Sequence, residues 1–163
     1  MKRIKLGILQ TNHDKSVEVG DAHPDDAHRF RDLFDAQELR FEYKVYMTIG
    51  GQVPKNLDEQ DAFLITGSPL SVLDSHLFTK DLIGFVRACD NAKKPLIGAC
   101  FGHQIIADAL GGKVEKSKNG YNVGVEETHF FEKKLWMKQK NKSFQCTFFM
   151  RMKLHSCLKV QNF

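Results

Sequence analysis

Short apolar runs alternate with stretches of helical period over the first two thirds of the chain. Runs of this kind are typical of strands buried on both faces of a sheet, and the stretches between them are long enough for crossover helices. The predicted strands are residues 4–9, 41–47, 62–65 and 95–99, and the predicted helices start at Pro24 or span residues 77–92 and 101–110. This order predicts an α/β fold, in which a mostly parallel central sheet lies between two helical layers.

Functional residues in such sheets gather at the carboxyl ends of the strands, where Thr66–Pro69 and Cys100 lie in this chain. Gly98 and Gly102 flank the cysteine and a predicted helix follows at once, which is the pattern of a nucleophile elbow with cysteine in place of serine. Glycine avoids clashes in the sharp turn, and the amino end of the helix directs N–H groups at the sulfur, which favours thiolate. Cys100 is therefore the predicted nucleophile. The alternative is a buried structural cysteine at the end of a strand.

The composition narrows the class of protein. With 42% hydrophobic and 27% charged residues, and no apolar run near the ~20 residues of a membrane helix, we expect a soluble chain without a membrane partner. The amino terminus lacks the apolar stretch of a signal peptide, so the expected location is cytoplasmic. We expect no metal and no cofactor, because the cysteines show neither a Cys-x-x-Cys pair nor zinc spacing. The four cysteines are Cys89, Cys100, Cys146 and Cys157.

The segment Gly98–Gln104 resembles the Gly-x-Cys-x-Gly-x-Gln signature of the class I glutamine amidotransferases. Further segments resemble that family in the same order along the chain: Ile65–Pro69, Ala109–Val114 and Gly120–Gly124. The resemblance covers about residues 4–131. Within the family, the chain is most similar to free-standing members that resemble the amidotransferase domain of GMP synthase. It implies a flavodoxin-like three-layer α/β sandwich with a mostly parallel central sheet and a nucleophile elbow, whose C-terminal part is incomplete here.

The resemblance also implies a reaction. Cys100 would attack the side-chain amide of glutamine, or a γ-glutamyl bond, and form a thioester that water then hydrolyses. The backbone N–H groups of Gly67, Ser68 and Phe101 would hold the oxyanion, and Gln104 would help to bind this small-molecule substrate. The alternative for Gln104 is a polar residue on the exposed face of a helix. We expect no attached synthetase domain, so the ammonia acceptor would be on a separate synthetase subunit or absent.

The remaining catalytic pair of the family is not found in the sequence. The resemblance implies a His-x-Glu or His-x-Asp pattern well after the nucleophile, yet only 63 residues follow Cys100. His155 is the only late candidate, and no acid follows Glu132 to orient it. His103 lies one helical turn from the cysteine and is not expected to be the base. The other histidines are expected to be surface or structural residues: His13, His23, His28, His76 and His129.

The end of the chain differs in character from the rest. Residues 133–163 hold eight of the 24 Lys/Arg and no acid, so the first 132 residues carry a net charge of −4 although the whole chain carries +4. Residues 138–163 also lack glycine, proline and a clear period. We therefore predict a partial amidotransferase-like domain at residues 1–137 and a basic tail at 138–163 that is non-native, through loss of the reading frame, or disordered. The alternative is a genuine short variant with a divergent end. A frame loss makes the basic charge accidental, so we expect no nucleic-acid partner.

The primary hypothesis is a glutamine amidotransferase-type hydrolase whose turnover is impaired, because the missing histidine and carboxylate act with the cysteine as a unit. A second hypothesis is a non-catalytic module that binds a small molecule or a protein through the same cleft. The retained elbow argues against it, because a strained turn has no evident use without chemistry. A third, a cysteine-elbow domain of the PfpI type, does not fit the signature that ends at Gln104.

Overall fold

The computed structural model describes residues 3–13, 24–118, 120–129, 143–150 and 152–154. They form two compact units, one made of the described residues up to Val114 together with Leu154, the other of those from Glu115 to Lys153. The first unit contains every residue of the predicted site. We describe each unit by itself.

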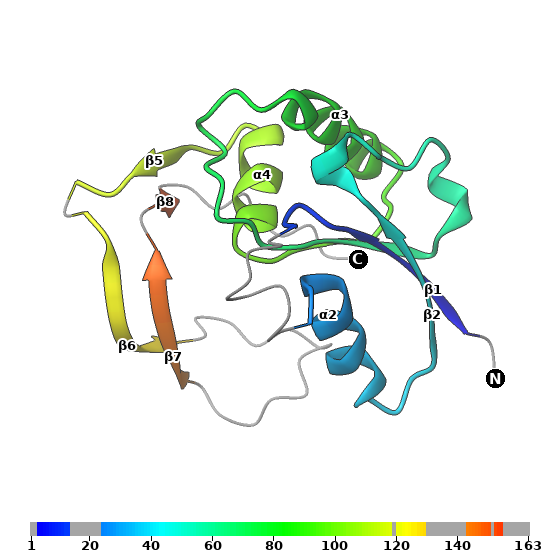
Figure 1. Cartoon of the computed structure of the whole chain (residues 1–163), viewed down its shortest axis with the longest axis horizontal. Helices are drawn as coiled ribbons and strands as arrows, with labels where there is room; N and C mark the ends of the chain where they lie inside the picture. The colour runs from blue at the N-terminus through cyan, green and yellow to red at the C-terminus, as the bar shows by residue number, and fades with distance from the viewer. Residues whose placement is uncertain (1–2, 14–23, 119, 130–142, 151, 155–163) are drawn as a thin grey trace. The chain divides into compact units, whose positions relative to one another are not determined.

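A parallel sheet of four strands, in the order β2-β1-β3-β4, is the centre of the first unit (Figure 1). β1 pairs in parallel with β2 and with β3, and β3 pairs in parallel with β4. The strands are Ile4–Leu9 (β1), Phe41–Tyr46 (β2), Ala62–Ile65 (β3) and Leu96–Gly98 (β4). All four predicted strands are confirmed, and with them the α/β class and its mostly parallel sheet.

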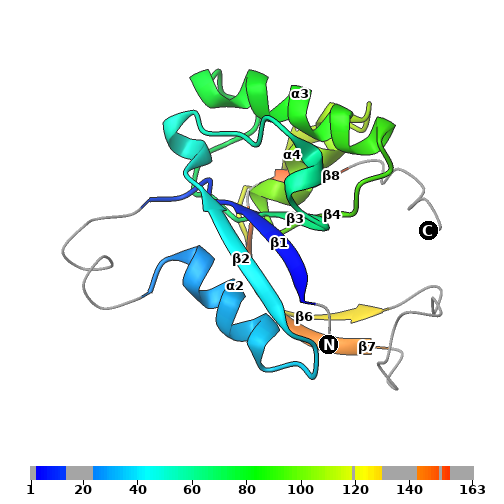
Figure 2. The same ribbon diagram turned by 90° about the vertical axis from the view of Figure 1, so that its right-hand side faces the viewer.

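Helices cover both faces of this sheet. The two views show α2 (Asp26–Asp35) on one face, and α3 (Leu77–Asn91) and α4 (Phe101–Ala109) on the other (Figure 1, Figure 2). Two single turns of 3-10 helix, Thr48–Gly50 and Leu57–Glu59, lie in the connection between β2 and β3. The three layers are those that the predicted fold requires.

The core follows from the alternation of side chains along the strands. One set, which consists of Leu6, Ile8 and Leu64, packs in one cluster with Ala27 of α2. The intervening residues face the other helical layer, where the ring of Phe63 meets that of Phe85 edge-on with centroids 5.0 Å apart. Gly7 leaves room for this aromatic pair, since a Cβ there would lie 2.7 Å from Cε1 of Phe63. The two central strands, β1 and β3, are therefore largely buried, whereas the edge strands β2 and β4 are partly exposed.

The start of α2 is fixed to the end of β1. Asp25 caps the helix, because its carboxylate accepts a hydrogen bond of 2.9 Å from the backbone N–H of His28. Gln10, at the carboxyl end of β1 and 1% exposed, accepts a hydrogen bond of 3.3 Å from the N–H of Ala27 through its Oε1. Two of the otherwise unpaired N–H groups of the first turn are thus bound, one of them by the sheet.

The structure describes four strands after α4: β5 (Val114–Lys116), β6 (Asn122–His129), β7 (Ser143–Met150) and β8 (Met152–Leu154). β6 and β7 lie wholly within the second unit, whereas Val114 of β5 and Leu154 of β8 belong to the first. β6 and β7 are antiparallel, with Val125 opposite Thr147, and β5 pairs with β8. The sequence did not predict β7 and β8, which lie within residues 138–163. The division of the chain at residue 137 stays a prediction.

No helix in the described part of the chain is long and apolar enough to cross a membrane. Within the same residues, no group of three or more histidine, cysteine, aspartate or glutamate side chains is arranged to hold a metal ion. The cytoplasmic location stays an expectation.

Candidate active site

The junction of β4 and α4 forms the sharp turn that the sequence predicts. Cys100 has φ 49° and ψ −104°, a conformation that residues with a side chain rarely adopt. Such a conformation costs on the order of 1–3 kcal/mol and persists only where the surrounding structure holds it. The Cys100 side chain is exposed, at the amino end of α4 and the carboxyl edge of the sheet. The elbow is therefore formed, and the thiol is not a buried structural one.

Gly98 and Gly102 are required here by space. A Cβ on Gly98 would overlap the carbonyl carbon of Gly102 and lie 2.6 Å from the backbone nitrogen of His103. A Cβ on Gly102 would overlap the carbonyl oxygen of Ile65, at the end of β3. Neither glycine has a positive φ, so conformational freedom is not the reason for their presence. Both permit direct contact between backbones, which any side chain would prevent.

Backbone hydrogen bonds hold the elbow against the end of β3. The N–H of Ala99 donates to the carbonyl oxygen of Ile65 at 3.0 Å. The N–H of Gly102 is shared between the carbonyl oxygens of Thr66, at 3.2 Å, and Ala99, at 2.8 Å. These bonds lie on both sides of Cys100 in the sequence, and they stabilise its strained conformation.

The loop after β3 meets the elbow at Gly67. A Cβ built on Gly67 would lie 3.6 Å from the Cβ of Cys100, so the bare face of the glycine is turned toward the nucleophile. In the described part of the chain, no acceptor binds the backbone N–H of Ser68 or of Phe101. Unpaired N–H groups beside a thiol are what an oxyanion hole needs. The structure thus brings the predicted residues together, and their role in catalysis stays a prediction.

The first turns of α4 divide their side chains between core and solvent. Phe101 is 1% exposed, and its ring centroid lies 6.1 Å from that of Phe78 in α3. Gln104 is 5% exposed, so the alternative that it lies on an exposed helix face is wrong. His103 is exposed. A contact between Gln104 and substrate stays a prediction.

The described histidines of the first unit do not complete a catalytic pair with the cysteine. Nδ1 of His28 lies 2.7 Å from Oδ1 of Asp25 at the start of α2. His76 stacks on Phe78 with ring centroids 5.8 Å apart, and its Nε2 is buried without a hydrogen-bond partner among the described residues. Among the described residues of the first unit, neither a histidine nor a carboxylate bonds to the Cys100 thiol. Two histidines lie outside the described residues: His23 and His155.

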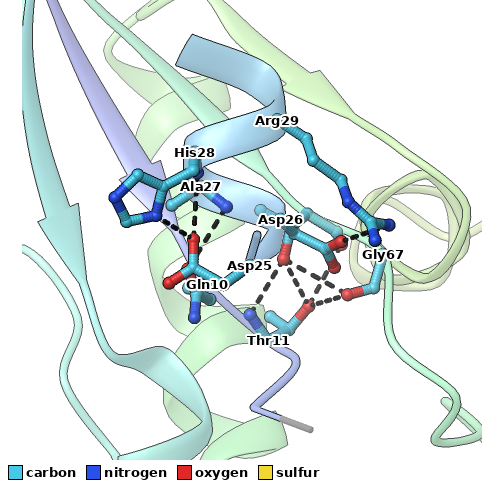
Figure 3. A network of polar contacts seen from close by, with 9 residues as sticks. Gln10, Thr11, Asp25, Asp26, Ala27, His28, Arg29 and Gly67 are labelled. Carbon is cyan, nitrogen blue, oxygen red and sulfur yellow. Dashed lines mark hydrogen bonds and ion pairs between the residues drawn. The ribbon is translucent and has the colours of Figure 1, made fainter. Parts of the chain in front are cut away.

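A buried hydroxyl network next to Gly67 was not predicted from the sequence (Figure 3). Thr11 follows β1 and Thr66 follows β3, and both are 0% exposed. Oγ1 of Thr11 lies 3.0 Å from the carbonyl oxygen of Gly67 and 3.1 Å from that of Thr66, and its one proton is shared between them. The Thr11 N–H donates to Oγ1 of Thr66 at 3.0 Å. The sequence shows only that each threonine follows the end of a predicted strand. The structure adds that those ends, Leu9 and Ile65, are paired in the sheet.

Comparison with known proteins agrees with this geometry. The family described as "Glutamine amidotransferase class-I" matches residues 35–154, a range that includes the elbow and β7. Gamma-glutamyl peptidase 3 of Arabidopsis thaliana is 34% identical over 86 residues, which cover 52% of this chain and 34% of that protein. The glutamine-hydrolyzing GMP synthase of Pyrobaculum aerophilum is 39% identical over 64 residues, which cover 39% of this chain and 12% of that protein. The chain thus spans about a third of the peptidase and less of the synthase.

A solved structure shows the same fold. The crystal structure of a glutamine amidotransferase from Methylobacillus flagellatus has a TM-score of 0.68 with this structure at 20% identity, over 94% of this chain and 57% of that chain. The match to the family itself extends over well more than half of the 163 residues. The chain therefore belongs to the class I glutamine amidotransferase family.

Proposed function

We propose that the chain uses Cys100 to cleave the bond between a γ-glutamyl carbonyl group and nitrogen. One relative is named as a gamma-glutamyl peptidase and another as a glutamine-hydrolyzing synthase. Both names imply a γ-glutamyl carbonyl carbon bonded to nitrogen, either as the side-chain amide of glutamine or as a peptide. The shared group, rather than either whole substrate, is what the elbow would act on.

The reaction begins with attack of the thiolate sulfur on the γ-carbonyl carbon. A carbon–sulfur bond forms and the carbonyl electrons move to oxygen, giving an oxyanion beside the N–H groups of Ser68 and Phe101. Collapse of this intermediate breaks the carbon–nitrogen bond, and the nitrogen takes up a proton and leaves as ammonia or an amine. Water then attacks the γ-glutamyl thioester, which releases glutamate and restores the thiol.

The observation that carries this proposal is the strained, exposed conformation of Cys100 beside backbone N–H groups that bind no acceptor among the described residues. A positive φ at a residue with a side chain costs free energy, and such strain clusters where it serves chemistry. We further propose that turnover is impaired, because no described histidine or carboxylate bonds to the thiol. Loss of general acid–base assistance slows a reaction by about 10²–10⁴-fold. A separate synthetase subunit that uses the ammonia is part of the proposal for glutamine as substrate.

The test is to incubate the chain with glutamine or a γ-glutamyl dipeptide, quench in acid and record the intact mass. We expect a γ-glutamyl group on Cys100 that hydroxylamine removes, with slow release of ammonia or amine, and neither in Cys100→Ala. Equal release by the wild type and Cys100→Ala, with no acylated chain, would contradict the proposal.

A non-catalytic binding module is the second candidate, and the absence of a described base is the observation that favours it. This candidate predicts that glutamine binds equally well to the wild type and to Cys100→Ala in titration calorimetry, without acylation of the wild type. Acylation at Cys100 would exclude it.

A further inference from the structure

The hydroxyl network next to Gly67 assigns a role to a residue outside the elbow. We propose that Thr11 is a positioning residue, which holds the peptide between Gly67 and Ser68 so that its N–H faces Cys100 and can serve the oxyanion. The inference rests on the proposed function, because it concerns the same oxyanion. Thr11 itself would touch neither substrate nor thiol.

The orientation of one peptide group carries the argument. The carbonyl oxygen of Gly67 accepts hydrogen bonds from Oγ1 of Thr11, at 3.0 Å, and from Oγ1 of Thr66, at 3.2 Å. In a planar trans peptide the C=O and the following N–H point in opposite directions. The N–H of Ser68 is therefore directed away from Thr11. The bare face of Gly67 is turned to Cys100, with 3.6 Å between its hypothetical Cβ and the cysteine Cβ.

Burial makes the hydroxyl of Thr11 hard to replace. Thr11 and Thr66 are both 0% exposed, so water does not substitute for a missing donor at this position. The two hydroxyl groups supply two protons, and two carbonyl oxygens, those of Thr66 and Gly67, lie within their reach. Without the Thr11 hydroxyl, the carbonyl oxygen of Gly67 keeps only the 3.2 Å bond from Oγ1 of Thr66, whereas that of Thr66 still accepts from the N–H of Gly102. The orientation of the Gly67–Ser68 peptide is then no longer fixed from β1.

The fold has other means of joining β1 to β3, so the hydroxyl is separable from the framework. The N–H of Thr66 donates to the carbonyl oxygen of Leu9 at 3.1 Å, and Leu9 is paired with Ile65 in the sheet. These bonds use only backbone atoms. Valine has nearly the shape of threonine, and Thr11→Val therefore keeps the packing while it removes the donor. Thr11→Ser keeps the donor and removes a methyl group.

The experiment compares two reactions of the same thiol in the full chain. The first is acylation by the phenyl thioester of γ-glutamate, in which Sγ of Cys100 attacks the γ-carbonyl carbon through an oxyanion and thiophenolate leaves. The second is alkylation by iodoacetamide, in which Sγ displaces iodide without an oxyanion. Both rates are measured for the wild type, Thr11→Val, Thr11→Ala and Thr11→Ser, after subtraction of the rate of Cys100→Ala. Thr11→Ala replaces Thr11→Val in the comparison if the valine variant does not fold, because alanine also lacks the hydroxyl and is smaller than threonine.

We expect Thr11→Val and Thr11→Ala to acylate about 10–100-fold more slowly than the wild type, less than the full loss of an oxyanion donor, with alkylation by iodoacetamide unchanged. Thr11→Ser should acylate within a few-fold of the wild type. Equal acylation by the wild type and Thr11→Val would overturn the inference while leaving the proposed function in place, and so would a parallel loss of both reactions. A wild type that alkylates but does not acylate at Cys100 would overturn the proposed function and this inference with it.

Discussion

The substitution Gly102→Ala tests whether the elbow is packed backbone against backbone. Its Cβ would lie 2.9 Å from the carbonyl carbon of Ile65 and would overlap the oxygen of that group. Carbon atoms pack best about 3.5–4.0 Å apart, so one of the two backbones must move by about 0.6–1.1 Å. Overpacking of a core costs about 1–3 kcal/mol, and we expect a loss of about 2–3 kcal/mol because a strand backbone, unlike a side chain, has no alternative rotamer.

Gly84→Ala is the matched control. It makes the same chemical change within α3, where no heavy atom lies within 4 Å of the added Cβ. Alanine is favoured over glycine inside a helix by about 0.5–1 kcal/mol, so this variant should be more stable than the wild type. Urea denaturation followed by circular dichroism gives both free energies of unfolding. If Gly102→Ala gains stability like the control, the backbone contact between β3 and α4 is not as close as described, and the reasoning is refuted.

Two further predictions concern titration. Burial raises the pKa of Cys89 to about 12, although the charge of Lys94 acts in the opposite direction. Near pH 8 a small alkylating reagent should therefore modify the exposed Cys100, and should modify Cys89 only in denaturant. Peptide mapping would show which cysteine is modified. The raised pKa also means that the neutral Cys89 thiol stabilises the folded protein relative to the unfolded one, in which the thiol ionises near its ordinary value of 9.0. This stabilisation is complete below pH 9.0 and declines as the pH rises toward 12. Cys89→Ala should therefore make the stability of the protein less dependent on pH over that range. At Asp25, burial acts to raise the pKa, but hydrogen bonds from His28 and the charge of its ring outweigh it and lower the pKa. The stability that the Asp25 carboxylate contributes is therefore present above its ordinary pKa of 3.8 and is lost as the pH falls through the pKa of the folded protein. Asp25→Ala should lower the free energy of unfolding by about 0.5–2 kcal/mol at pH 7. Asp25→Asn keeps the cap, so it should lower the free energy of unfolding by less and show no such loss in acid. Equal losses in both variants would contradict the capping role.

The parts of the site that are local in sequence could be predicted. The elbow needs a strand, a cysteine between two glycines and a helix, and all of these lie between Pro95 and Leu110. The steric demand that selects Gly98 and Gly102 arises from the turn itself, so the residue types report the geometry. The buried strands were predicted for the same reason, since burial on both faces leaves an uninterrupted apolar run.

The parts that depend on long-range pairing could not be predicted. Thr11 and Thr66 are 55 residues apart, and only the register of β1 with β3 brings their hydroxyls together. β7 alternates polar and apolar residues from Ser143 to Phe148, a strand signal that the sequence analysis missed, and β6 supplies its antiparallel partner. Leu33 falls at helical spacing with Phe30 and Phe34 but is 57% exposed, because the face of α2 that packs against the sheet carries Phe30 and Phe34, together with Ala27, and not Leu33. A catalytic base far from Cys100 in the sequence would be equally hard to predict, because only the fold would bring it to the cysteine.

The most direct test of the central claim is mass spectrometry of the purified chain after reaction with the chloromethyl ketone analogue of glutamine. The account predicts one adduct, on Cys100, that free glutamine suppresses and that Cys100→Ala lacks. This result would mean that the elbow presents a nucleophile to a γ-glutamyl group. Equal labelling of all four cysteines, unaffected by glutamine, would contradict the account, because the elbow would then confer neither reactivity nor recognition on Cys100.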